Sequence, residues 1–230
     1  MSWLTGLEQW LLPEECLLCR GSPSDGLICR LCRYRWPRLP EPMCSRCGQP
    51  TLLTELACRL CDGWGPELTR VRSAVWHEGG ARDAVHQLKY EGWWRVTESL
   101  ARAMTALEPL TGRLVLVPVP LAARRLRDRG YNQSEHLARA LGDLVSKPVR
   151  VAALKRVRET PTQTALTPEA RLANVAGAFK ASGVHGSRVV LVDDVFTTGA
   201  TLIAAAAALT QAGAAQVEAV TFARAKPSIT

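Results

Sequence analysis

The chain has 230 residues, enough for one ordinary domain and a small module, and its 47% hydrophobic content suits a packed core. No stretch reaches the roughly 18 consecutive apolar residues of a membrane span, and the first ten residues lack the pattern of a signal peptide. These features exclude a mainly disordered chain and predict a soluble cytoplasmic protein without a membrane span. The formal net charge is +8, and 24 of the 29 basic residues are Arg, whose guanidinium group forks onto phosphate.

The start of the chain is predicted to form a short amphipathic helix that packs on the protein itself. The apolar residues that recur there at helical spacing are Trp3, Leu4, Leu7, Trp10 and Leu11. Further along, the composition changes after residues 64–66, Trp-Gly-Pro, where alternating apolar segments begin. The sequence thus predicts a module of residues 1–66 and a second domain of residues 67–230.

All eight cysteines lie in the predicted module and form four Cys-x-x-Cys pairs. The pairs are Cys16 and Cys19, Cys29 and Cys32, Cys44 and Cys47, and Cys58 and Cys61. A two-residue gap lets two thiolates bind one metal at tetrahedral angles, so the spacing predicts two structural Zn2+ sites in a double zinc ribbon. Nearly equal gaps within the first and second halves favour sequential pairing, whereas an interleaved cross-brace would use the same ligands. A docking surface for a partner is the alternative to a purely structural role.

Residues 67–230 alternate between strand and helix patterns, which predicts an α/β domain with a mostly parallel, doubly wound sheet. The expected strands are 71–76, 114–119, 149–154, 189–192 and 217–222. The expected helices are 81–90, 97–107, 134–145, one that opens at 167–168, and 199–212. Ligands of such sheets bind at the carboxyl ends of the strands.

The stretch from Val189 to Thr201 carries the most chemical information. Four apolar residues predict a buried strand, Asp193 and Asp194 emerge at its end, and a hydroxyl-rich turn leads directly into a helix. A helix N-terminus presents unpaired N–H groups to a phosphate dianion, and Gly199 lets the backbone approach closely. Two carboxylates would repel that phosphate unless they face ribose hydroxyls or Mg2+. The stretch therefore predicts a site for a phosphorylated sugar.

This stretch resembles the fingerprint of the type I phosphoribosyltransferases, in which four apolar residues, two acids and two apolar residues precede Thr-Thr-Gly. The resemblance implies phosphoribosyl pyrophosphate with Mg2+ as the ligand, and Asp193 and Asp194 on its ribose hydroxyls. The residues implied at its 5-phosphate are Thr197, Thr198, Gly199, Ala200 and Thr201. An ordinary strand, turn and helix with surface Asp residues is the alternative.

Further motifs are the segment 117–120, Val-Pro-Val-Pro, the run from Arg125 to Gln133, the pair Lys89-Tyr90, and Thr160, Gln163, Leu166, Arg171 and Asn174. Together they resemble the competence-associated ComF family. Members combine an N-terminal cysteine module with a phosphoribosyltransferase domain. The family is implicated in DNA uptake during natural transformation, so the resemblance implies work beside DNA-uptake machinery.

The excess positive charge is concentrated in residues 112–160, which hold eleven Lys or Arg against four acids. Clustered Arg after a strand can place guanidinium groups over a pyrophosphate at the edge of the sheet. Arg125, Arg129 and Lys89 are the residues we expect there. For Arg124 and Arg127 in particular, a solvated helix face is the alternative.

Residues 155–166 show no regular apolar period and are predicted to form a mobile loop. Phosphoribosyltransferases close a flexible hood over their substrate, which excludes water from the reaction. The candidates on such a hood are Lys155, Arg156, Arg158 and Gln163. An exposed linker is the alternative.

Two functions remain open. The first is a competence factor that binds phosphoribosyl pyrophosphate and handles single-stranded DNA, through candidates that combine charge with aromatic rings. They are Arg124, Arg127, Tyr90, Trp93 and Trp94, although the two Trp rings could instead pack in the core. The second is a salvage phosphoribosyltransferase, a glycosyltransferase in which the nitrogen of a free base displaces pyrophosphate from the anomeric carbon. No residue pattern identifies a catalytic group or the accepting base.

Overall fold

The centre of the molecule is a four-stranded parallel sheet. The computed structural model describes residues 15–22, 26–51, 58–159 and 177–227. The strand order is β1-β6-β5-β2, and all neighbours are parallel. The strands are β1 (Arg70–Trp76), β2 (Val115–Pro118), β5 (Arg188–Phe196) and β6 (Gln216–Arg224). The predicted α/β class and mostly parallel sheet are confirmed.

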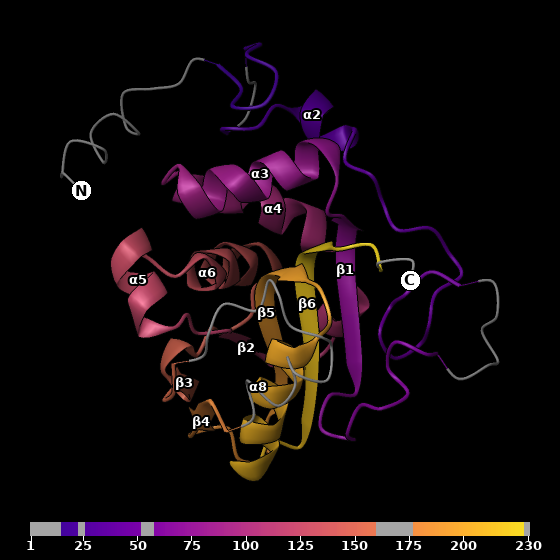
Figure 1. Ribbon diagram of the computed structural model, residues 1–230, viewed down its shortest axis with the longest axis vertical. Coiled ribbons are helices and arrows are strands. Elements are labelled where there is room, and N and C mark those ends of the chain that lie inside the picture. The colour runs from indigo at the N-terminus through magenta and orange to yellow at the C-terminus, as the bar shows by residue number, and fades with distance from the viewer. Residues whose placement is uncertain (1–14, 23–25, 52–57, 160–176, 228–230) are drawn as a thin grey trace.

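Helices cover both faces of this sheet (Figure 1). The helices α3 (Gly79–Tyr90), α4 (Thr97–Met104) and α6 (Gln133–Val145) lie on one face, and α8 (Ala200–Gln211) lies on the other. Successive side chains of a strand point to opposite faces, so β5 contributes to both cores. Val190 and Val192 pack in the core that holds α3, α4 and α6, whereas Val189 and Leu191 pack in the core that holds α8.

The remaining elements are short. Two of them are the helices α2 (Arg30–Tyr34) and α5 (Ala123–Arg129). Three 3-10 turns span Trp94–Val96, Glu108–Leu110 and Val151–Ala153. The strands β3 (Leu154–Arg156) and β4 (Phe179–Ala181) pair with each other in antiparallel fashion. The predicted helix 97–107 ends earlier, at Met104. The expected helices at 3–11 and 167–168 lie outside the described residues.

Two predictions for the segment after α6 are wrong. The expected strand 149–154 is a single parallel bridge from Val149 to Leu116, followed by a 3-10 turn. Lys155 and Arg156, predicted to lie in a mobile loop, belong to β3. The physical reason is their pairing with β4, where Phe179 is buried and the Arg156 guanidinium lies 5.4 Å from the centre of its ring.

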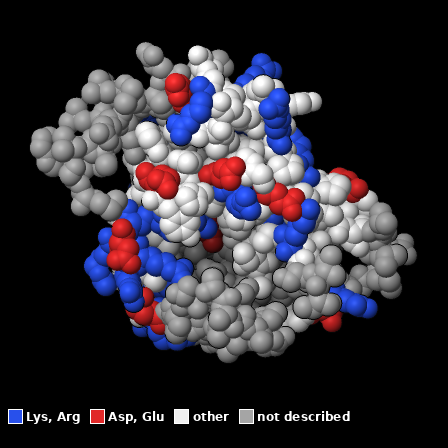
Figure 2. Space-filling view, turned by 45° about the horizontal axis from the view of Figure 1, so that its top comes forward, with Lys and Arg blue, Asp and Glu red and all other residues white. Residues whose placement is uncertain are grey.

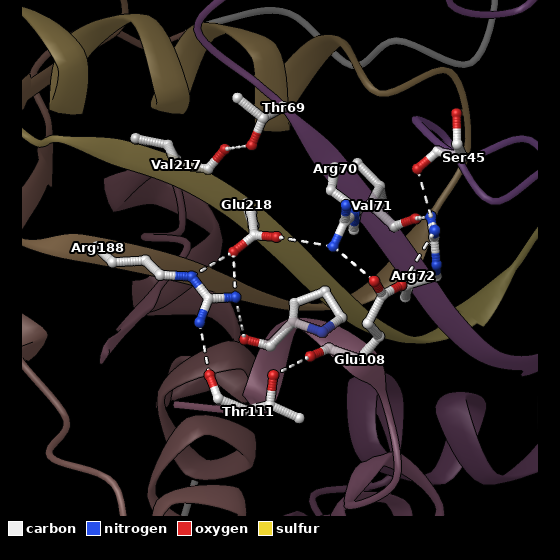
Figure 3. Close-up of polar contacts among 11 residues, drawn as sticks. Ser45, Thr69, Arg70, Val71, Arg72, Glu108, Thr111, Arg188, Val217 and Glu218 are labelled. Carbon is white, nitrogen blue, oxygen red and sulfur yellow. Dashed lines mark hydrogen bonds and ion pairs between the residues drawn. The ribbon is translucent and has the colours of Figure 1, made fainter. Parts of the chain in front are cut away.

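A buried carboxylate fastens the amino end of the sheet (Figure 3). Glu218 of β6 is fully buried and accepts a hydrogen bond of 2.7 Å from Nε of Arg188, the first residue of β5. Its other oxygen lies 3.7 Å from Arg70 of β1, which also pairs with Glu108 at 2.6 Å. These contacts join three strands at the edge opposite the end where ligands of such sheets bind. Among the described residues, none of the helices has the length and apolar character needed to cross a membrane.

Candidate functional site

The eight cysteines form two separate groups of four. Cys16, Cys19, Cys29 and Cys32 make the first cluster, and Cys44, Cys47, Cys58 and Cys61 make the second cluster; within each, the thiol groups lie within 4.8 Å of one another. The pairing is therefore sequential, as favoured by the spacing. The interleaved arrangement does not occur.

The sulfur atoms have the spacing that zinc requires. The Sγ–Sγ distances between Cys16 and Cys32 and between Cys19 and Cys29 are 3.9 and 3.8 Å. In the second cluster, Cys44–Cys61 and Cys47–Cys58 measure 3.7 and 3.6 Å. Four sulfur atoms placed tetrahedrally at a Zn–S distance of about 2.3 Å would be about 3.8 Å apart. The two sets of four thiols thus fit structural Zn2+.

The backbone prepares one thiol of each cluster to bind a cation. Burial raises the pKa of Cys16, but hydrogen bonds from the N–H groups of Cys29, Cys19 and Leu18 outweigh it and bring the pKa to about 7. Burial also raises the pKa of Cys44, but hydrogen bonds from the N–H groups of Cys47 and Arg46 outweigh it and bring this pKa to about 7 as well. Zinc binds the thiolate form, so these hydrogen bonds favour metal binding near neutral pH.

The phosphoribosyl motif forms a pocket at the carboxyl end of β5. The pocket is lined by Asp193, Val195, Phe196 and the segment 197–202, which we call the phosphate loop. Gly199 precedes the first residue of α8 with φ of +84°, a left-handed conformation that glycine adopts without strain. The first turn of α8 has no side-chain cap, so its N–H groups are available at the positive end of the helix dipole.

The two acids belong to the strand rather than to the turn after it. β5 continues to Phe196, and Asp193 pairs with Thr221 of β6 in the register of the sheet. The expectation that both carboxylates lie beyond the strand is therefore wrong, because hydrogen bonding to β6 extends past the apolar run. The two side chains nevertheless have different surroundings.

Asp193 faces the pocket, whereas Asp194 is held in an ion pair. The Asp193 carboxylate accepts a hydrogen bond of 2.6 Å from the Ser134 hydroxyl of α6. Asp194 is buried, and its carboxylate lies 2.8 Å from Nζ of Lys89. The negative charge of Asp194 is thus compensated inside the protein. Asp193 remains the acid available to a ligand.

The pKa values agree with this division. Burial, and then the Asp194 charge, raise the pKa of Asp193 to about 7. Burial lowers the pKa of Lys89, but the Asp194 carboxylate outweighs it and raises the pKa overall, so that Lys89 is charged. Lys89, expected at the pyrophosphate, therefore serves Asp194 in the structure. His77 follows β1 nearby, and burial and the Lys89 charge lower its pKa.

Basic residues gather beside the pocket. Burial lowers the pKa of Arg156, and the charges of Arg125 and Arg158 lower it further, while those of Glu159 and Asp193 raise it. Arg156 of β3 therefore lies in electrostatic contact with Arg125 of α5, with the residues that follow β3, and with Asp193. Arg129 instead hydrogen-bonds the side chain of Gln133 and lies 5.8 Å from the Tyr90 ring. Gln163 lies outside the described residues.

The helix α5 is a basic projection on the surface. It has no buried residue, and Arg124 and Arg127 are exposed. Blue side chains gather in Figure 2 at the left, where α5 lies in Figure 1. Arg124 makes an ion pair of 4.0 Å with Asp128, and its backbone N–H donates to Glu159.

The aromatic candidates divide into two kinds. Tyr90 and Trp94 are 69% and 40% exposed. Trp94 stacks on His136 at a ring distance of 4.8 Å, whereas Trp93 packs against the core between α3 and α4. Trp93 is therefore not a candidate for contact with DNA. For this ring, packing against the core, which the sequence left open as the alternative, is confirmed.

Some residues at the site are not recognisable in the sequence. Ser134 is one, because a single Ser at the start of a helix carries no spacing signal that links it to Asp193, 59 residues away. Trp64 is another: its ring lies 6.0 Å from the ring of Phe196, and both rings lie beneath Gly199. In the sequence, Trp64 marks only a domain boundary.

Comparisons with known proteins agree with both parts of the chain. Residues 7–62 match the double zinc ribbon domain, and residues 126–229 match the phosphoribosyl transferase domain. The DNA utilization protein YhgH of Escherichia coli strain K12 is 33% identical over 218 residues, which cover 90% of this chain and 95% of that protein. The competence protein ComFC of Bacillus subtilis strain 168 is 27% identical and covers 91% and 94% of the two chains. The chain belongs to the ComF family.

A further match is to a solved structure. The glutamine phosphoribosylpyrophosphate amidotransferase of B. subtilis, in complex with ADP and GMP, matches with a TM-score of 0.38 and 23% identity. The match covers 54% of this ComF-family chain and 25% of the amidotransferase.

Proposed function

We propose that this protein binds phosphoribosyl pyrophosphate with Mg2+ at the phosphate loop and handles single-stranded DNA in DNA uptake. The observation that carries the first half is the pocket in which Asp193 faces the uncapped N-terminus of α8. The N–H groups of that turn bind the 5-phosphate, with the hydroxyls of Thr197, Thr198 and Thr201 as further donors. Asp193 binds the ribose hydroxyls or the Mg2+, and the Lys89 pair keeps Asp194 from repelling the phosphate.

The basic residues are assigned to the other end of the same ligand. Arg156 interacts electrostatically with Asp193, and Arg125 and Arg158 interact with Arg156; these three residues bind the pyrophosphate through their planar donor groups. Binding of phosphoribosyl pyrophosphate without any reaction is enough to account for this arrangement of residues. Transfer to a nitrogen base would in addition release pyrophosphate, with Mg2+ and these guanidinium groups stabilising its charge.

The DNA role is supported by the relatives and by the surface. The relatives are named for DNA utilization and competence. The exposed Arg124 and Arg127 of α5 provide charge for phosphates, and the exposed rings of Tyr90 and Trp94 can stack on unpaired bases. Single-stranded DNA should therefore bind more tightly than duplex DNA, because only unpaired bases offer their faces.

The ligand is tested by calorimetric titration of the full zinc-loaded chain with phosphoribosyl pyrophosphate and Mg2+. Thr198→Val removes one hydroxyl donor and should weaken binding by about 1 kcal/mol. Thr210→Val makes the same change at the exposed far end of α8 and should leave affinity unchanged. No binding by the wild type, or equal weakening in both variants, contradicts the proposal. Pyrophosphate release in the presence of a free base would identify the transferase instead.

The DNA surface is tested by fluorescence anisotropy with a labelled single strand over a range of salt concentrations. Trp94→Ala should weaken binding without changing the salt dependence, whereas Arg127→Ala should reduce the slope by about 0.7 for each phosphate that the protein no longer neutralises. Arg139→Ala is the control, because Arg139 is already paired with Glu135 at 2.8 Å. An affinity indifferent to salt, or an Arg139→Ala effect equal to that of Arg127→Ala, rules out the α5 surface.

A further inference from the structure

Two aromatic rings form a floor beneath the phosphate loop. A Cβ atom placed on Gly199 would lie 3.1 Å from Cε2 of Phe196 and 3.1 Å from Cζ2 of Trp64. Such distances leave no space between the backbone of Gly199 and the two rings. Phe196 belongs to β5, but Trp64 follows the second cysteine cluster, three residues after Cys61. The position of the phosphate loop therefore depends in part on Trp64, a residue outside the sheet.

Each ring lies against an arginine that is bound to the second cluster. The guanidinium of Arg224 lies 4.3 Å from the centre of the Phe196 ring and donates to the carbonyl of Cys47 at 2.7 Å. The guanidinium of Arg46 lies 5.6 Å from the centre of the Trp64 ring and donates to the carbonyl of Cys61 at 3.4 Å. Two parallel chains of contacts thus run from cluster cysteines, through an arginine and a ring, to Gly199.

The burial of Arg224 also ties it to the second cluster. It is the last residue of β6 and only 1% exposed, so its charge needs an anionic partner. Its Nη2 lies 3.9 Å from Sγ of Cys47, and its Nε donates to the side chain of Gln49 at 3.0 Å. Four thiolates with one Zn2+ carry a formal charge of about −2, which compensates the buried guanidinium.

The first cluster has no comparable connection. Cys16 and Cys29 pack in the core that holds α3 and α4, on the face of the sheet opposite α8. The ring beside them is Trp36, which contacts Phe222 at a centroid distance of 4.9 Å. In the described residues, no arginine links this cluster to a ring beneath Gly199, and the cluster shares with Val195 only the apolar packing of that core.

We propose that the second cysteine cluster positions the phosphate loop, with Arg224 and Trp64 as the positioning residues, and that the first cluster does not. The proposal rests on the phosphate loop as the phosphoribosyl site. Zinc in the second cluster and ligand in the loop are then energetically coupled, so each strengthens the binding of the other. The metal would make no contact with the ligand, and its effect would pass through the two arginines and the two rings.

The experiment compares matched variants of the full chain, Cys58→Ser in the second cluster and Cys32→Ser in the first. Both residues are partly buried cluster thiols. Zinc content is measured, hydrogen exchange is followed in peptides that cover residues 196–202, and affinity for phosphoribosyl pyrophosphate with Mg2+ is determined. Cys58→Ser should speed exchange in these peptides about tenfold and weaken binding about fivefold or more, whereas Cys32→Ser should change both by less than about twofold.

A second pair keeps all eight ligands, in case loss of a thiol unfolds the module. Trp64→Leu should speed exchange at residues 196–202 with two zinc ions retained, Trp64→Phe should restore much of the protection, and the buried Trp36→Leu should leave these peptides unchanged. Equal effects within either pair would overturn the proposal. If the wild type does not bind phosphoribosyl pyrophosphate but the exchange differences are found, the proposed ligand is wrong and the positioning role stands.

Discussion

Replacing Gly199 by Ala tests how tightly the phosphate loop is seated. At φ of +84° an L-residue is strained by about 1 to 2 kcal/mol. The added methyl group would also lie 3.1 Å from one atom of each ring beneath it, and overpacking of this kind costs about 1 to 3 kcal/mol. Together the two effects predict a decrease of about 2 to 5 kcal/mol in the free energy of unfolding.

Gly130 provides the control for the backbone contribution. It has the same φ of +84° at the end of α5, and no atom lies within 4 Å of the position its Cβ would take. Gly130→Ala should therefore show only the dihedral cost of about 1 to 2 kcal/mol. Urea unfolding of the zinc-loaded variants measures both. Equal decreases at the two positions would show that the rings can move away and that the loop is not seated on them.

Three further predictions concern the buried charges. Lys89→Met leaves Asp194 as an unpaired buried carboxylate and should cost about 3 kcal/mol or more in urea unfolding, with a smaller cost when combined with Asp194→Asn; additive costs would disprove the pair. Glu218→Ala removes the partner of Arg188 at the amino end of the sheet and should cost about 3 kcal/mol while leaving affinity for phosphoribosyl pyrophosphate unchanged, since the ligand site lies at the other end. Asp193→Asn should stabilise the protein, because the raised pKa of Asp193 shows that its ionised form is disfavoured in the folded state. The increase in the free energy of unfolding should grow as pH rises from the usual pKa of 3.8 to about 7 and stay constant above that pH. An increase independent of pH would show that Asp193 titrates normally.

The sequence predicted the elements that bury a continuous apolar face. The runs 189–192 and 217–222 are strands because both faces of the sheet are covered, and the cysteine spacing predicted both metal clusters. A helix at α5 was expected only as the alternative of a solvated basic face, because α5 buries nothing and so has no apolar period. β3 and β4 were missed because three-residue strands depend on each other, and their sequences lie more than 20 residues apart.

The site was predictable in its motif but not in its electrostatics. The order of residues from Val189 to Gly199 identifies the phosphate loop, yet it treats Asp193 and Asp194 alike. Their different roles depend on Ser134 and Lys89, which the fold brings from two other helices. The hydrogen bond between Arg224 and Cys47 joins residues 177 positions apart, so no local pattern could indicate it.

The most direct test of the central claim is a crystal structure of the zinc-loaded protein with phosphoribosyl pyrophosphate and Mg2+. We expect the 5-phosphate within hydrogen-bonding distance of the N–H groups at the start of α8. We also expect the ribose or Mg2+ at Asp193, the pyrophosphate toward Arg125 and Arg156, and the ion pair of Asp194 with Lys89 intact. A ligand bound only along α5, or a phosphate loop left empty at saturating concentration, would contradict it.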